Sequence, residues 1–338
     1  MNMNQPNHKD LTARSFLRVM AGVAIAIALV SVGVNYFTDR YYVFHPQDGV
    51  FEEILEPNTR VLKATYLDEN CEQFDATIFG SSRAAVYPTS EFNRVFGTRT
   101  YNFGVATGSL PGILARLEWL AGRGCMPGRV FLAVSIDRLR FPDRPNDLLR
   151  KEYPAIVGGA AYQREFLLSY LGSDALVSNV RKLWEKIIED PASRFRYHMA
   201  TGDAEYLWDR ELEFPACPDG SISTDAVTIR QFVDYIRKIK ELADSYGSGL
   251  TLIWNPIPKA EQIAHLQDAR NLFQALSGVA DDLYRLPVTD ERLLDGRNFH
   301  DRGHFKPELG SAVIASDEHR VSLEQLTLEL EQAAQLCH

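Results

Sequence analysis

The stretch that decides the fold is Asp75–Arg83, with the sequence DATIFGSSR. Its apolar run from Ala76 to Phe79 ends in Gly80, which is followed by two serines and an arginine. A short apolar run that stops at a glycine predicts a buried β-strand ending in a tight turn. Because ligands of open α/β sheets bind at the carboxyl ends of the strands, this turn would deliver a serine hydroxyl to a ligand site.

Four further stretches predict buried strands downstream of this one. Helical stretches lie between them, one opening at Ser109 with Pro111 in its first turn and one spanning about residues 225–245. This alternation is typical of βαβ units and predicts an α/β fold, a parallel sheet with helices on both faces. The four strand stretches are Thr98–Phe103, Arg129–Ile136, Gly249–Trp254 and Leu283–Leu286.

The N-terminal region predicts a membrane anchor. Val19–Thr38 is a run without a charged residue, and at 1.5 Å per residue it spans roughly 30 Å, the thickness of a hydrocarbon core. Lys9, Arg14 and Arg18 precede the run, so the positive-inside rule puts the N-terminus in the cytoplasm and the rest outside. A cleaved signal peptide and a buried core helix stay open as alternatives. The aromatic residues expected at the far membrane interface are Tyr36, Phe37, Tyr41 and Tyr42.

The chain therefore divides into four parts. Residues 1–15 are expected to be a cytoplasmic tail, residues 16–38 the transmembrane anchor and residues 39–70 a connecting segment. Residues 71–338 form the α/β domain, and residues 141–224 interrupt it as a helical insertion expected over the carboxyl end of the sheet. Its helical stretches are Ala161–Tyr170 and Asp174–Ile188.

Charge and composition limit the class of partner. The 338-residue chain has a net charge of −9 and no block of lysine or arginine, which disfavours nucleic acid because phosphate binding needs a concentrated basic face. A carbohydrate or an acyl donor is compatible with this charge. The sequence holds no glycine-rich phosphate loop and no convincing metal cluster, so no cofactor and no metal are expected.

Four cysteines fit an oxidising compartment. No pair has the CxxC spacing of zinc or thioredoxin-like sites. Cys71 lies just before the first strand of the sheet and Cys125 just before the third. These strands are neighbours in a flavodoxin-like order, so we predict a Cys71–Cys125 disulfide. The pairing of Cys217 and Cys337 stays open.

Three short motifs carry a resemblance to a known family. Gly80-Ser81-Ser82, Asn102-Phe103-Gly104 and Asp301-x-x-His304 resemble the first, second and last blocks of the SGNH (GDSL-type) hydrolase superfamily. The resemblance covers about residues 70–140 and 225–320. It implies a flavodoxin-like three-layer α/β/α sandwich.

The resemblance also implies roles for individual residues. Ser82 would be the nucleophile, His304 the base that takes its proton, and Asp301 the group that orients the imidazole. Backbone N–H groups of Ser82 and Gly104 would hold the oxyanion. His300 and Asp295 are nearby alternatives that break the family spacing.

One block departs from the family pattern. The third block usually supplies an asparagine to the oxyanion hole, but Ile136 stands there, followed by Asp137. Asn255 or Arg83 would have to substitute. Arg83, Asp137 and Arg138 are also candidate substrate-binding residues; an anionic polymer and an ordinary solvated surface both fit the basic residues Arg138, Arg140, Arg144 and Lys151. Tyr206, Trp208 and Phe214 are candidates for stacking on sugars or for core packing.

The Gly-Ser-Ser version of the first block resembles membrane-anchored extracytoplasmic proteins that assist O-acylation of envelope polymers. These include alginate O-acetylation proteins and the D-alanylation partner of lipoteichoic acid synthesis. The resemblance implies an inner-membrane protein with its main domain in the periplasm, a cell-surface glycan as substrate, O-acetylation as the reaction and a multi-spanning membrane acyltransferase as partner. Two alternatives stay open: a carbohydrate esterase or lipase of the same type, and a non-catalytic scaffold of envelope assembly.

Overall fold

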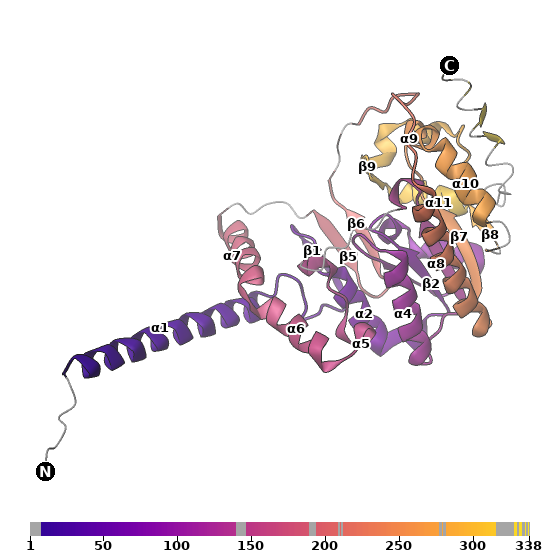
Figure 1. Cartoon of the computed structure of the whole chain (residues 1–338). Coiled ribbons are helices and arrows are strands. Elements are labelled where there is room, and N and C mark those ends of the chain that lie inside the picture. Colours follow the sequence, from indigo (N-terminus) through magenta and orange to yellow (C-terminus); the bar gives the residue numbers. More distant parts are fainter. Residues whose placement is uncertain are drawn as a thin grey trace, which may run out of the picture.

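Five parallel strands form the central sheet of the computed structural model, in the order β3-β2-β4-β7-β8 (Figure 1). All five overlap the stretches that the sequence predicts, because strands buried on both faces read as continuous apolar runs. The strands are β2 Ala76–Gly80, β3 Thr100–Gly104, β4 Arg129–Val134, β7 Gly249–Trp254 and β8 Asp282–Tyr284. The structure describes residues 8–139, 147–188, 194–208, 210, 212–276, 279, 282–315, 328–329, 331–332, 335 and 337, with the side chains of residues 8–13, 138 and 186–188 left out.

Helices cover both faces of this sheet. Side chains alternate along each strand, so Phe79 and Leu132 join one buried cluster whereas Ile78 and Phe131 join another. The helices on the first face are α4 Leu110–Gly122, α8 Ala226–Ser245, α9 Lys259–Ala264 and α10 Leu266–Leu276. Those on the second face are α3 Thr89–Phe96 and α11 Pro307–Ile314.

Residues 39–70, expected to be a connecting segment, contain two elements. They are the strand β1 Val50–Glu53 and the helix α2 Thr59–Asn70. The side chain of Asn58 caps α2 by accepting hydrogen bonds from the backbone of Arg60 and Val61. Strand β1 belongs to a second, antiparallel sheet of order β1-β5-β6, with β5 Phe195–His198 and β6 Asp203–Tyr206. This sheet joins the segment before the core to the insertion after β4.

The insertion contains the two predicted helices, but most of it does not lie over the sheet. Its helices are α5 Pro154–Val157, α6 Ala160–Leu171 and α7 Ser173–Ile188. Helices α6 and α7 pack against the end of α1 and lie to one side of the sheet (Figure 1). Among the described residues of the insertion, Tyr206 of β6 reaches the carboxyl edge of the sheet, where its hydroxyl contacts Ser82. The insertion was expected to lie over the carboxyl end of the sheet, which is wrong for α6 and α7 but holds for the end of β6.

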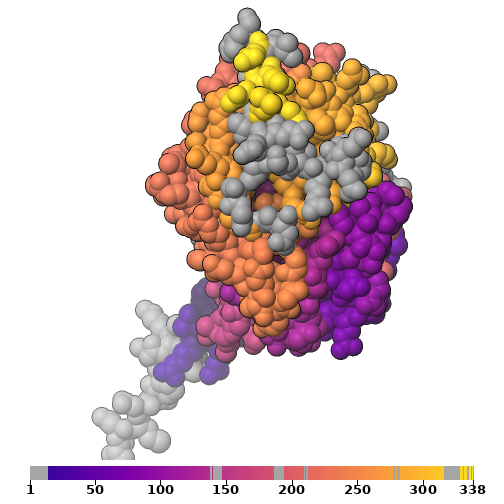
Figure 2. Space-filling view, turned by 90° about the vertical axis from the view of Figure 1, so that its right-hand side faces the viewer, coloured from indigo at the N-terminus to yellow at the C-terminus, as the bar shows by residue number. Residues whose placement is uncertain are grey.

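One helix, α1 His8–Thr38, has the length and composition of a membrane span. Its stretch Arg14–Thr38 covers 25 residues, and an 18-residue window within it has a mean hydropathy of 2.3 and no buried residue. It projects away from the body of the domain in both views (Figure 1, Figure 2). Of the four aromatic residues expected at the interface, Tyr36 and Phe37 are exposed, whereas Tyr41 is buried against Tyr170.

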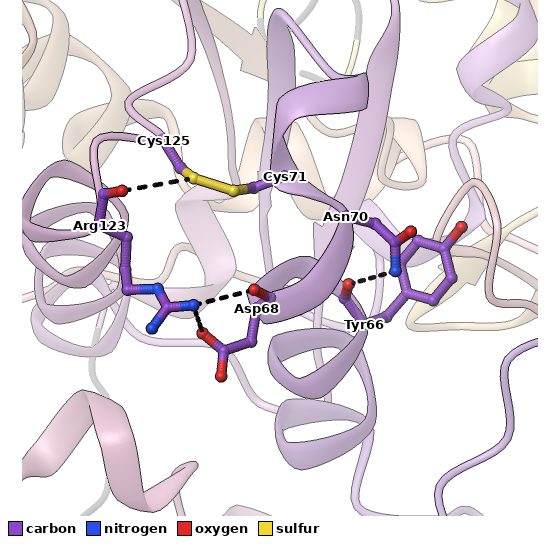
Figure 3. Close-up of a disulfide and its surroundings, with 6 residues drawn as sticks. All are labelled: Tyr66, Asp68, Asn70, Cys71, Arg123 and Cys125. Atoms are coloured by element: carbon purple, nitrogen blue, oxygen red, sulfur yellow. Dashed lines mark hydrogen bonds and ion pairs between the residues drawn. A yellow bond between two sulfur atoms is a disulfide. The ribbon is translucent and has the colours of Figure 1, made fainter.

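The structure contains the predicted disulfide between Cys71 and Cys125, with the two Cα atoms 5.8 Å apart (Figure 3). Beside it, Arg123 pairs with Asp68 at 2.6 Å. In the chain-entropy model, closing a loop of this length stabilises the fold by about 4 kcal/mol. A second disulfide joins Cys217 to Cys337, the pairing that the sequence left open. Two disulfides fit an extracytoplasmic domain.

Candidate active site

The turn after β2 is held closely by its neighbours. A Cβ atom on Gly80 would lie 2.5 Å from the Cβ of Ala84 and 2.9 Å from the carbonyl oxygen of Ala133. Gly108 approaches from the loop after β3, where an added Cβ would lie 2.2 Å from the carbonyl oxygen of Gly80. Only glycine fits at these two positions. The turn therefore carries Ser82 on a backbone with little freedom to shift.

A short hairpin brings the two distant candidates to this turn. It consists of β9 Phe299–Asp301 and β10 His304–Phe305. The Oγ atom of Ser82 lies 2.9 Å from Nε2 of His304. Nδ1 of the same ring lies 2.9 and 3.0 Å from the two carboxylate oxygens of Asp301. The structure thus places Ser82, His304 and Asp301 in the hydrogen-bonded chain that the sequence motifs anticipate.

The carboxylate of Asp301 is held in its ionised form. Partial burial alone would raise its pKa, but the hydrogen bond and the charge of His304 and the backbone N–H groups of Gly303 and His304 oppose that effect and lower the pKa to about 2. The N–H of Gly303 donates to Oδ1 at 2.7 Å. An ionised carboxylate at Nδ1 keeps the proton on that nitrogen and leaves Nε2 free to accept one from the serine.

The alternative histidine and aspartate are engaged elsewhere. His300 Nδ1 lies 2.8 Å from the backbone oxygen of Trp208. The carboxylate of Asp295 accepts hydrogen bonds from the guanidinium of Arg297 at 2.7 to 3.1 Å. Neither residue joins the serine.

Arg83, a candidate for substrate binding, is engaged in contacts within the protein beside Ser82. Its buried guanidinium forms a bidentate pair with Asp137, at 2.6 and 2.8 Å. It also donates to Oγ of Ser135 and, through Nε, to the backbone oxygen of Gly303. Substrate binding by Arg83 and Asp137 stays a prediction; the sequence did not show that these two charges pair with each other. The side chains of Arg138, Arg140 and Arg144 lie outside the described residues.

The expected oxyanion donors are only partly available. The N–H of Gly104, a predicted donor, already donates to Oδ1 of Asn102 at 2.9 Å. Asn255 follows β7, which is separated from β2 by β4. Ile136 is buried in the core, as its apolar side chain requires. The N–H of Ser82 stays a predicted donor.

Tyr206 supports the site from the second sheet, a role that the sequence did not reveal. Its hydroxyl donates to the backbone oxygen of Ser82 at 3.2 Å. Its ring meets the ring of His304 edge to face, with 4.9 Å between centroids. One side chain of β6 thus contacts both ends of the serine–histidine pair.

A cleft of about 720 Å³ shares Tyr206 with the site, although Ser82, Asp301 and His304 do not line it. The second sheet and the residues around β9 and β10 line it, including Trp208, His300 and Lys306. The ring of Trp208 stacks on Tyr206 at 4.7 Å and is half-buried. Phe214 packs instead against Phe299, so Trp208 is the candidate for ligand stacking.

Lys151, a candidate for binding anionic polymers, is buried and pairs with Glu165.

A buried lysine contacts the end of β3, the strand next to β2 and the turn that carries Ser82. Lys63 on α2 is fully buried and donates to the backbone oxygen of Gly104 at 2.6 Å. Burial is the largest cause that lowers its pKa, to about 7. The folded protein therefore releases this proton well before the unfolded chain does.

This difference predicts how stability changes with pH. The unfolded chain keeps a proton on Lys63 up to about pH 10, so above pH 7 it binds more protons than the folded state and stability rises with pH. Between pH 7.5 and 9.5, the free energy of unfolding should rise by about 2–3 kcal/mol more in the wild type than in Lys63→Met. Urea denaturation of the detergent-solubilised chain measures this. Lys238→Met, at an exposed lysine, should behave as the wild type. Parallel curves for Lys63→Met and the wild type would contradict the prediction.

No protein-family model, curated protein or solved structure matches this chain.

Proposed function

We propose that this protein is a membrane-anchored extracytoplasmic acyl-transfer protein that takes part in the O-acylation of a cell-envelope glycan. One observation carries the proposal: Ser82, His304 and Asp301 form a continuous hydrogen-bonded chain at the carboxyl edge of the sheet. A serine hydroxyl is a weak nucleophile, and this chain is the arrangement that activates it.

The reaction has two balanced steps. Nε2 of His304 takes the proton of Ser82 as Oγ attacks the acyl carbonyl, and His304 returns that proton to the leaving oxygen of the donor. The resulting acyl-serine is attacked by a glycan hydroxyl, whose proton passes to His304 and then to Ser82. Asp301 stays ionised throughout and stabilises the imidazolium. Acetyl is the proposed acyl group.

The fold supports the assignment to an SGNH-like protein. Counted within the central sheet, the strand order β3-β2-β4-β7-β8 corresponds to the flavodoxin-like order 2-1-3-4-5. The nucleophile turn follows the first strand of that sheet, as in the family. The helices α1, α6 and α7 and the second sheet are additions to this core.

The location of the site supports a glycan substrate. The cleft that shares Tyr206 with the site offers an aromatic ring, Trp208, together with charged groups such as Lys306, and aromatic faces with polar neighbours suit sugar rings. With the domain outside the cytoplasm, cytoplasmic acyl-CoA cannot serve as the direct acyl donor. A multi-spanning membrane protein would therefore deliver the acyl group.

The test is the acyl content of the surface glycan in cells that carry Ser82→Ala in place of the wild type. Transfer through Ser82 predicts that acylation is lost, since the covalent carrier is missing. Ser81→Ala is the matched control and should keep acylation. A rise in acylation in Ser82→Ala cells would instead indicate an esterase. Unchanged acylation would indicate a scaffold.

Trp208 offers a second test of the same site. Trp208→Ala should weaken glycan binding by about tenfold, equivalent to about 1.4 kcal/mol. The labelling rate of Ser82 by a small fluorophosphonate should not change, because the probe does not use the cleft. The change keeps the backbone oxygen that His300 contacts. Equal loss of labelling and of glycan acylation would contradict a binding role.

A further inference from the structure

Helices α6 and α7 carry exposed apolar side chains around the corner where they meet. Val177 is 74% exposed and Trp184 is 61% exposed. On α7, Val177, Val180 and Trp184 follow the three-and-four spacing of a single helix face. We call this set the corner stripe; its members are Leu167, Leu168, Val177, Val180, Leu183 and Trp184.

Hydrogen bonds fix this corner to the last turns of α1. Asn35 of α1 donates through Nδ2 to the backbone oxygen of Gly172, the residue between α6 and α7, at 2.8 Å. Asn179 of α7 donates to Oδ1 of Asn35 at 3.1 Å and accepts from the N–H of Arg40 at 2.9 Å. Asn35 is 1% exposed. The position of the corner along α1 is therefore set by the structure.

The length of α1 then determines the depth of the corner. Side chains 14–30 of α1 are all exposed, a stretch of about 25 Å, which is shorter than a hydrocarbon core of about 30 Å. With Arg14 and Arg18 at the cytoplasmic surface, the hydrocarbon core of the bilayer must extend from about Val19 to the level of Asn35–Thr38. The corner between α6 and α7 packs against α1 at this same level.

The chemistry of the corner suits the headgroup layer. The amide of Asn35 finds its partners inside the protein, as a polar group at this depth must. Phe37 of α1 is 82% exposed at the same level. Asp174 and Arg181 border the stripe and are exposed, and Arg181 pairs with Glu185 at 2.6 Å. Charges beside apolar and tryptophan side chains are typical of helices that lie in the interface plane.

We propose that the corner stripe lies in the headgroup layer of the outer leaflet, as a second membrane contact beside the span of α1. The occupant of this apolar face is lipid. The inference rests on α1 crossing the bilayer but not on the acyl-transfer chemistry. Two attachments instead of one would hold the domain in a fixed orientation toward the membrane.

Tryptophan quenching tests the contact. The full chain is reconstituted into phosphatidylcholine vesicles whose acyl chains carry bromine close to the headgroup. Trp119 and Trp254 are buried in the domain and Trp208 lies at the cleft, so the proposal predicts that Trp184 accounts for most of the quenching. Trp184→Phe should remove most of it, whereas Trp208→Phe should remove none.

Two results would overturn the proposal. One is equal quenching of the wild type and Trp184→Phe, which would leave the stripe outside the lipid and available to a protein partner. The other is stronger quenching by bromine near the end of the acyl chain, which would bury the stripe too deeply. Circular dichroism of Trp184→Phe checks that the fold is kept. The experiment needs no enzyme activity, so failure of the proposed function would leave its result intact.

Discussion

His304→Ala should slow the reaction of Ser82 with a fluorophosphonate probe by about 10⁴- to 10⁶-fold. Among the described residues, the substitution removes the one group hydrogen-bonded to Oγ of Ser82 that can take its proton, at 2.9 Å. The serine itself stays in place, held by the turn at Gly80. Probe labelling of the detergent-solubilised chain, followed over time, gives the rate for each variant.

His300→Asn is the matched control for this prediction. His300 lies on the same hairpin strand as Asp301, but its ring contacts the backbone of Trp208 and not the serine. Its substitution should leave the labelling rate almost unchanged. A triad role for His304 would be abandoned if both variants lost labelling equally, or if His304→Ala labelled as fast as the wild type.

Arg83→Met should destabilise the fold by about 3–5 kcal/mol, the cost of leaving one partner of a buried ion pair uncompensated. The carboxylate of Asp137 would lose both hydrogen bonds of the bidentate pair. The backbone oxygen of Gly303, between Asp301 and His304, would lose its donor as well. Urea denaturation measures the first effect, and the labelling rate of Ser82 measures the second.

A double substitution separates these two effects. Arg83→Met with Asp137→Leu removes both charges of the pair, so stability should recover by most of the loss. The labelling rate should stay low, because nothing restores the hydrogen bond to Gly303. Arg94→Met, which breaks an exposed pair with Glu91, should cost less than about 1 kcal/mol. Recovery of the labelling rate in the double variant would leave Arg83 with a structural role alone.

The central sheet and the arrangement of Ser82, Asp301 and His304 follow from the sequence for a physical reason. Parallel strands buried on both faces need uninterrupted apolar runs, and Ala76–Phe79 is one. A side chain placed just after such a strand must lie at its carboxyl edge. The spacing of Asp301 and His304 then fits a hairpin that presents both side chains on one side.

The second sheet could not be predicted in the same way. Its strands are four residues each and half polar, and β1 pairs with β5 across more than a hundred residues of chain. Arg83 shows a related limit, since its partner Asp137 is fixed by the sheet order and not by spacing. The N–H of Gly104 is lost to Asn102, two residues away, through a local bond that motif comparison does not consider.

The second sheet has a consequence for the distance between α1 and the candidate active site. Its first strand begins 12 residues after the end of α1, and its last strand presents Tyr206 to His304, so a path of paired strands runs from α1 toward the candidate active site. In Figure 1, β9 lies in the upper part of the domain, away from the point where α1 joins it. Ser82 would then lie at a fixed distance from the bilayer. An acyl group that leaves the membrane must be carried up to it, whereas a polymer passing above the lipid surface would meet it directly.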